Sequence, residues 1–108
     1  MNPHEASANK TYNITQNGTT FIPLPANPAG KLVLVRIIVN TKGASSNTAA
    51  IYDSNETIGA NNERKKGTLD TVNTIGSIEY GLPMFNGIYI VVATGTAADM
   101  TVVYAETP

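Results

Sequence analysis

The longest apolar run of the chain, residues 31–40, is apolar on both faces that a β-strand would present. Side chains along a strand alternate between two faces. One face would carry Val33, Val35, Ile37 and Val39, and the other Leu32, Leu34, Arg36 and Ile38. A strand that is wet on one side shows polar residues at alternate positions. We therefore expect a cover on both sides, the first being the opposing sheet and the second a neighbouring subunit.

Shorter segments with apolar alternation predict further strands over residues 10–16, 19–24, 48–53, 68–72, 76–82, 88–94 and 99–106. Turn residues separate them, and Asn17-Gly18 is the strongest hairpin signal, because both central residues of a type I′ turn need φ > 0. About eight short strands at close spacing predict a single-domain antiparallel β-sandwich of Greek-key or jelly-roll type. The two runs that are apolar on both faces, 31–40 and 88–94, would be its central strands.

Composition supports the all-β fold and one domain. At 108 residues the chain fits one domain with a modest core, which oligomerisation would help to stabilise. Threonine and asparagine are abundant, which suits strands and turns, and no window shows a helical period. We expect residues 1–9 to form a flexible N-terminal arm and residues 10–108 to form the β-sandwich domain. The charged cluster at residues 61–66 is predicted to lie in an exposed loop.

Charge and cysteine content exclude several classes of function. The formal net charge of -1 argues against a broad nucleic-acid surface. The absence of cysteine excludes disulfides and thiolate metal sites. No apolar signal-peptide core and no run of about 18 apolar residues is present. We expect a soluble protein without a nucleic-acid or membrane partner.

The residues that could carry catalysis form no recognisable arrangement. His4 is the only histidine and belongs to the predicted arm, where no rigid cleft would position it as a base. The carboxylates that could form an acid/base pair show no motif spacing: Asp53, Glu56, Asp70, Glu79 and Asp99. We therefore expect no enzyme activity, no cofactor, no metal and no small-molecule substrate.

Several segments resemble the small β-sandwich structural proteins of tailed-bacteriophage particles, and most closely capsid decoration, or cement, proteins. The matching segments are residues 39–48 leading into 51–53, 67–71, 76–81, 86–88 and 93–104, and the span that encloses them covers about two thirds of the chain. The resemblance implies a non-enzymatic virion protein, assembled in the host cytoplasm and bound to the outer capsid surface. It also implies a homotrimer that bridges subunits of the major capsid protein.

Two sets of residues are the candidate contacts for such a role. Leu32, Leu34 and Ile38 would bury apolar surface between copies, with Arg36 paired across the interface. Pro3, His4 and Glu5, in the polar arm, would order on the capsid.

Two other functions stay open on the sequence. One is a head–tail or tail-fibre component of the virion. The other is a carbohydrate-binding β-sandwich module, which usually presents exposed aromatic rings to sugars. The chain has no tryptophan, and most of its tyrosines fall at positions predicted to point inward, which counts against such a module.

Overall fold

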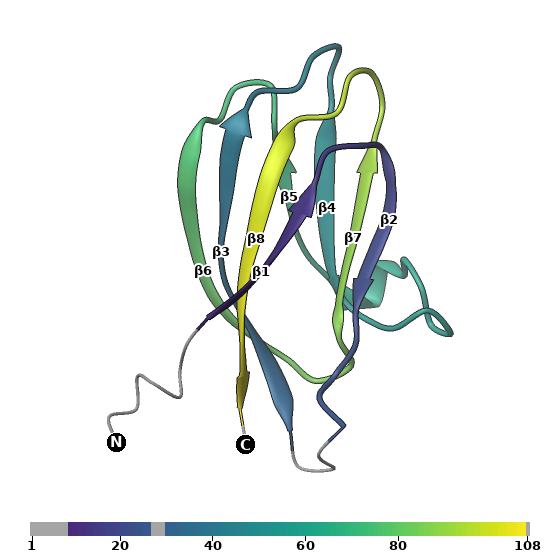
Figure 1. Ribbon diagram of the computed structural model, residues 1–108. Helices are drawn as coiled ribbons and strands as arrows, with labels where there is room; N and C mark the ends of the chain where they lie inside the picture. The colour runs from purple at the N-terminus through teal and green to yellow at the C-terminus, as the bar shows by residue number, and fades with distance from the viewer. Residues whose placement is uncertain (1–8, 27–29, 108) are drawn as a thin grey trace.

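The chain folds into two four-stranded sheets packed face to face (Figure 1). The computed structural model describes residues 9–26 and 30–107. Within these residues there are eight strands and one short 3-10 helix. They are β1 (Lys10–Ile14), β2 (Gly18–Ile22), β3 (Lys31–Thr41), β4 (Thr48–Asp53), η1 (Asn62–Arg64), β5 (Lys65–Asp70), β6 (Gly76–Met84), β7 (Ile88–Ala93) and β8 (Asp99–Thr107). The predicted all-β sandwich of about eight strands is confirmed.

The strand order is that of a jelly roll. The first sheet, sheet A, has the order β1-β8-β3-β6, and the second, sheet B, has the order β2-β7-β4-β5. All pairings are antiparallel. Among the described strands, only β4 and β5 are consecutive in sequence and also lie in one sheet. Every other connection crosses from one sheet to the other, as in the double-sheet jelly rolls. The central strands β3 and β7 are those that the apolar runs predicted.

The predicted hairpin at Asn17-Gly18 is wrong. β1 pairs with β8 in sheet A and β2 pairs with β7 in sheet B, so the two strands on either side of this turn do not pair with each other. Gly18 has a positive φ of 131°, but Asn17 does not have one, so the type I′ conformation that the signal demands is not formed. Long-range strand pairing decides whether a turn closes a hairpin or crosses between sheets.

A β-bulge in β3 changes which side chains point inward. The register of β3 with both β6 and β8 shifts between Leu34 and Arg36. A bulge adds one residue and so reverses the alternation beyond it. The inward side chains, each 0–1% exposed, are Leu32, Leu34, Ile37 and Val39. The face predicted from strict alternation is therefore wrong for Val33 and Val35, which are partly exposed.

The core lies between the two sheets and is built of aliphatic and methionine side chains. Its buried members are Ile14, Ile22, Leu32, Leu34, Ile37, Val39, Ala49, Ile51, Leu69, Met84, Ile88, Ile90, Val92, Ala98, Met100 and Val102. All eight strands contribute to it. At about 1.5–3 kcal/mol for each fully buried large side chain, this burial is the dominant favourable term in folding.

At one end of the sandwich a buried asparagine ties four connections together. Asn47, in the β3–β4 connection, is 0% exposed. Its Nδ2 group donates to Oδ1 of Asn17 and to the carbonyls of Ala93 and Thr94, at 2.8–3.2 Å. Its Oδ1 atom accepts from the hydroxyl of Thr71. The β1–β2, β3–β4, β5–β6 and β7–β8 connections are thus fixed relative to one another.

Candidate interaction surface

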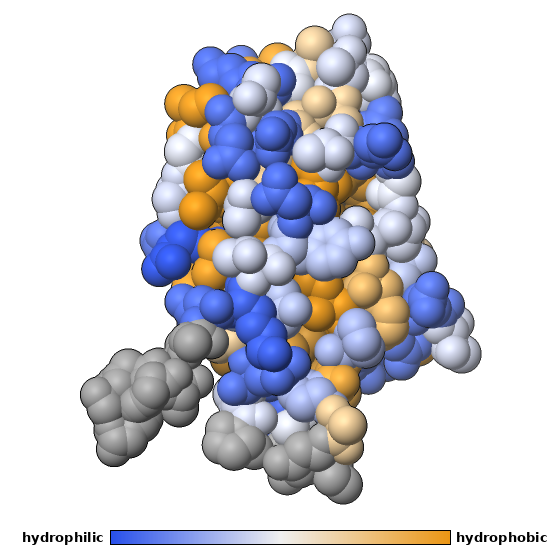
Figure 2. All heavy atoms as spheres, viewed as in Figure 1, coloured by the Kyte–Doolittle hydropathy of each residue, from blue (hydrophilic) through white to orange (hydrophobic). Residues whose placement is uncertain are grey.

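The outer face of sheet A carries apolar side chains that the domain itself leaves partly uncovered. We call these five residues the sheet A patch: Val33, Val35, Ile38, Pro83 and Ala105. Four are partly exposed and Pro83 is exposed. Val33 lies opposite Pro83 on β6 and opposite Ala105 on β8, so these three side chains form a group across three strands. Ile38 lies further along β3, beyond Arg36, opposite Ser77 and Thr101. Apolar atoms stand among polar ones along the β3–β6 side of the molecule in Figure 2.

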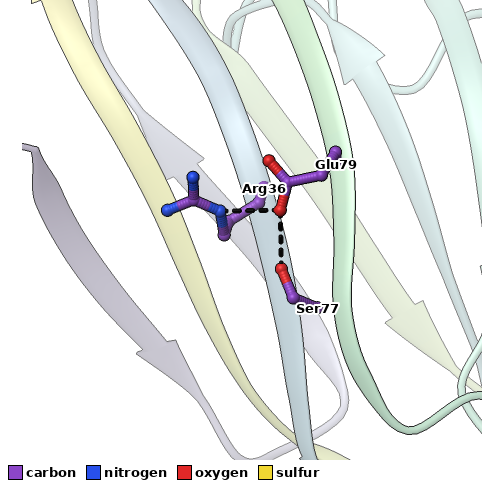
Figure 3. Close-up of polar contacts among 3 residues, drawn as sticks. All are labelled: Arg36, Ser77 and Glu79. Atoms are coloured by element: carbon purple, nitrogen blue, oxygen red, sulfur yellow. Dashed lines mark hydrogen bonds and ion pairs between the residues drawn. The ribbon is translucent and has the colours of Figure 1, made fainter.

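An ion pair lies on the same face, next to the patch (Figure 3). Nε of Arg36 on β3 donates to Oε2 of Glu79 on β6 at 2.8 Å, and the Ser77 hydroxyl donates to the same oxygen at 2.8 Å. Arg36 lies directly opposite Glu79 in the strand register. The hydrogen bond from Arg36, with that from Ser77, lowers the pKa of the Glu79 carboxyl below its ordinary value.

The Arg36 side chain is less exposed than its partner. It is 34% exposed, against 64% for Glu79. On its other side, Arg36 lies opposite Val103 of β8, which is only 5% exposed. In Figure 3 the guanidinium turns away from Glu79 towards β8. Among the described residues, Nε is its only group that makes a hydrogen bond, so the two Nη groups remain available to an acceptor outside this part of the chain.

The structure corrects two of the predicted contact residues. Leu32 and Leu34 are 0% exposed and belong to the core, because the bulge in β3 places their side chains between the sheets. They cannot form an exposed contact surface. Ile38 does lie on the outer face and is partly exposed. The ion pair that Arg36 makes is within its own chain rather than across an interface. Pro3, His4 and Glu5 lie outside the described residues.

Four of the five patch residues were not predicted from the sequence. Val33 and Val35 were assigned to the wrong face because a bulge gives no reliable sequence signal in a run of β-branched residues. The strand predicted over residues 76–82 stops before Pro83, whereas β6 continues through Pro83 to Met84.

The end of sheet A beyond the patch is polar and connected by hydrogen bonds. Asn13 on β1, Thr101 and Asp99 on β8, and Asn40 on β3 form a row of side-chain contacts across three strands. Thr101 donates to Asn13 at 2.7 Å, Asn40 donates to Thr101 at 3.0 Å, and both amides approach Asp99 at 3.3–3.4 Å. This polar row borders the apolar patch on one side, as a polar rim borders the core of an interface.

The outer face of sheet B differs in being aromatic. Phe21, Tyr89 and Tyr52 lie opposite one another on β2, β7 and β4. The ring centroids are 6.3 and 6.2 Å apart, and the rings meet at 51° and 86°. These are tilted and edge-to-face contacts, a favourable geometry for aromatic pairs. The rings therefore pack on each other across the three strands.

Three of the carboxylates considered for catalysis, Asp53, Asp70 and Glu79, hold turns or an ion pair. Asp53 is buried and accepts from the backbone N–H groups of Phe85 and Asn86 at 2.9 and 2.8 Å. Asp70 accepts from Val72 and Asn73. In the part of the chain that the structure describes, no three histidine, cysteine or acidic side chains gather closely enough to hold a metal ion. No helix within residues 9–26 and 30–107 is long and apolar enough to span a membrane.

Neither models of known protein families nor the sequences of curated proteins give a match to this chain. The resemblance to phage decoration proteins therefore depends on the segments of the sequence analysis. In the structure, residues 39–48 include the end of β3 and the connection with Asn47, and residues 93–104 run from β7 into β8. Both meet at the end of the sandwich where Asn47 joins the connections.

Proposed function

We propose that this chain is a non-enzymatic structural protein of a phage particle, which binds the outer capsid lattice as a homotrimeric decoration protein. The observation that supports the proposal is the sheet A patch beside the Arg36–Glu79 pair. A charged residue beside a partly exposed apolar group suits a surface that is buried on assembly. The virion assignment follows from the resemblance of the sequence to cement proteins.

The sheet A patch is the core of the proposed contact between copies. A standard interface buries roughly 800 Å² on each partner. The five side chains of the sheet A patch supply less area than this. The polar row of Asn13, Asn40, Asp99 and Thr101 would therefore form its rim. A three-fold contact is heterologous, so the patch of one copy packs against a different surface of the next.

Arg36 would give the contact its specificity. Its Nε is held by Glu79, which fixes the direction of the guanidinium, and its Nη groups are directed towards β8. A carboxylate of the next copy would receive charge-assisted hydrogen bonds from them. Such a bond gains strength when assembly excludes water around it, because the local dielectric falls.

The capsid partner in this proposal is the major capsid protein. The test uses particles of the encoding phage assembled without this protein. Purified chain is added and the particles are sedimented, then imaged by cryo-electron microscopy. We expect saturable binding and regular density on the outer lattice.

Two results would overturn this role. If the chain stays in the supernatant, it does not decorate the particle. If its density appears at the portal vertex or on tail fibres, the head–tail or tail-fibre alternative replaces the decoration role. Bovine serum albumin at the same concentration is the control for non-specific sedimentation.

A further inference from the structure

A shallow hollow lies at the open edge of the sandwich, away from the sheet A patch. β1 is an edge strand of sheet A, β2 is an edge strand of sheet B, and the chain passes directly from one to the other. The hollow has a volume of about 240 Å³ and is lined by residues 12–20. Sites for drug-sized ligands are usually about 300–1,000 Å³, so this one suits a smaller ligand.

The lining is uncharged and rich in hydrogen-bonding groups. One aromatic ring, three amides and three hydroxyls surround the hollow: Tyr12, Asn13, Gln16, Asn17, Thr15, Thr19 and Thr20. Tyr12 is 46% exposed, one of the large apolar or aromatic side chains that the described fold leaves most open. No carboxylate, ammonium or guanidinium group is among the lining residues. A ligand that fits this surface is neutral, polar and partly apolar.

One of the amides is held in place from behind. Asn17 donates to the carbonyl of Gly95 at 2.8 Å and accepts from the buried Asn47 at 2.9 Å. This amide keeps donor and acceptor capacity beyond these bonds. Groups fixed before binding lose less conformational entropy when a ligand arrives.

We propose that this hollow binds one ring of a neutral saccharide. The Tyr12 ring packs against the C–H face of the sugar, and the amides of Gln16 and Asn17 bind its hydroxyls. A sugar combines an apolar face with a rim of neutral donors and acceptors, which is the chemistry that the hollow offers. The site goes beyond the decoration role and would let a bound copy hold a glycan while the sheet A patch stays within the assembly.

Saturation-transfer NMR on the purified chain tests the site. The probes are the methyl glycosides of glucose, galactose, mannose and N-acetylglucosamine. We expect transfer to at least one of them, with amide shifts of the ¹⁵N-labelled chain confined to residues 12–20 and their hydrogen-bonded neighbours. If no sugar in this set receives transfer, or if the shifts map elsewhere, the site is refuted.

Variants of two lining residues distinguish binding in the hollow from non-specific binding to the rest of the surface. Tyr12→Ala should abolish transfer, while Tyr12→Phe should retain it because the ring remains. Gln16→Ala should weaken binding by about 2–10-fold, the effect of one net hydrogen bond. Phe85→Ala, which removes a ring that is 55% exposed outside the hollow, is the matched control and should bind as the wild type does.

Transfer that persists in Tyr12→Ala would overturn the site, provided that the amide spectrum shows a folded chain. Particle sedimentation separates this proposal from the decoration role. Tyr12→Ala should bind the capsid normally, because Tyr12 is not in the sheet A patch.

Discussion

The Thr71 hydroxyl donates a hydrogen bond of 2.6 Å to Oδ1 of Asn47, and neither side chain is exposed to solvent. Asn47→Ala removes this acceptor and leaves the carbonyls of Ala93 and Thr94 without their side-chain donor. A buried polar group that loses its partner costs about 1–3 kcal/mol. We expect Asn47→Ala to lower the free energy of unfolding by about 2–4 kcal/mol in urea denaturation.

The matched control for Asn47 is Asn40→Ala. Asn40 also makes side-chain hydrogen bonds, to Asp99 and Thr101, but it is exposed and water can replace them. We expect a loss of less than about 1 kcal/mol. Equal losses at the two positions would show that Asn47 does not hold the end of the sandwich together.

The bulge in β3 predicts opposite responses at neighbouring positions. Leu34 is 0% exposed, so Leu34→Ala should cost about 2–5 kcal/mol in the free energy of unfolding. Val33 is partly exposed, so Val33→Ala should cost less than about 1 kcal/mol. Urea denaturation of the two variants measures both. The reverse order would mean that the strict alternation of the sequence holds and that the bulge is absent.

The two Asn-Gly turns should differ in their tolerance of a side chain. Gly18 and Gly87 both have positive φ, 131° and 134°, so alanine is strained at either position. A Cβ at Gly18 would meet nothing within 4 Å, whereas one at Gly87 would lie 2.6 Å from a ring carbon of Phe21. Gly87→Ala should therefore be less stable than Gly18→Ala by about 1–3 kcal/mol, the usual cost of overpacking. Thermal melting monitored by circular dichroism measures the difference. Equal melting midpoints for the two variants would contradict this prediction.

The Arg36–Glu79 pair predicts a pH dependence with a definite sign. Because the folded-state pKa of Glu79 is lowered, the pair stabilises the fold above the ordinary glutamate pKa. That contribution is lost as the pH falls through the lowered value. In Arg36→Gln, the Glu79 pKa should rise towards its ordinary value, as measured by ¹³C NMR titration of the carboxyl.

Asp70 is an internal control in the same titration. The Asn73 side chain, with the Val72 backbone N–H, lowers the Asp70 pKa, and Arg36 takes no part. The Asp70 pKa should therefore stay low in Arg36→Gln and rise in Asn73→Ala. A Glu79 pKa that does not respond to Arg36→Gln would show that the ion pair is absent in solution.

Local patterns were sufficient to predict the strands but not their partners. The alternation of β6 and the turn residues around it are encoded within a few neighbouring positions, so the strand predicted over residues 76–82 was found as β6 (Gly76–Met84). Whether Asn17-Gly18 closes a hairpin depends on β7 and β8, about seventy or more residues away in sequence. No local pattern contains that information.

The candidate surface was predicted only in part for the same reason. Ile38 and Arg36 were correctly placed on an outer face, but Leu32 and Leu34 were not. A bulge arises because β6 and β8 impose their own registers on β3. Nearly all residues of this run are apolar, so its hydrophobic pattern fits a strand with a bulge as well as a strand with strict alternation. The sequence therefore does not distinguish the two registers.

Sedimentation equilibrium of the wild type and of two charged variants tests most directly whether the sheet A patch joins copies of the chain. We predict a trimer for the wild type and a folded monomer for Ile38→Glu, because a carboxylate in the patch would lose its hydration on assembly. Val91→Glu, at a partly exposed valine on the outer face of sheet B, should remain a trimer. A monomeric wild type, or an Ile38→Glu variant that still forms trimers, would contradict the account.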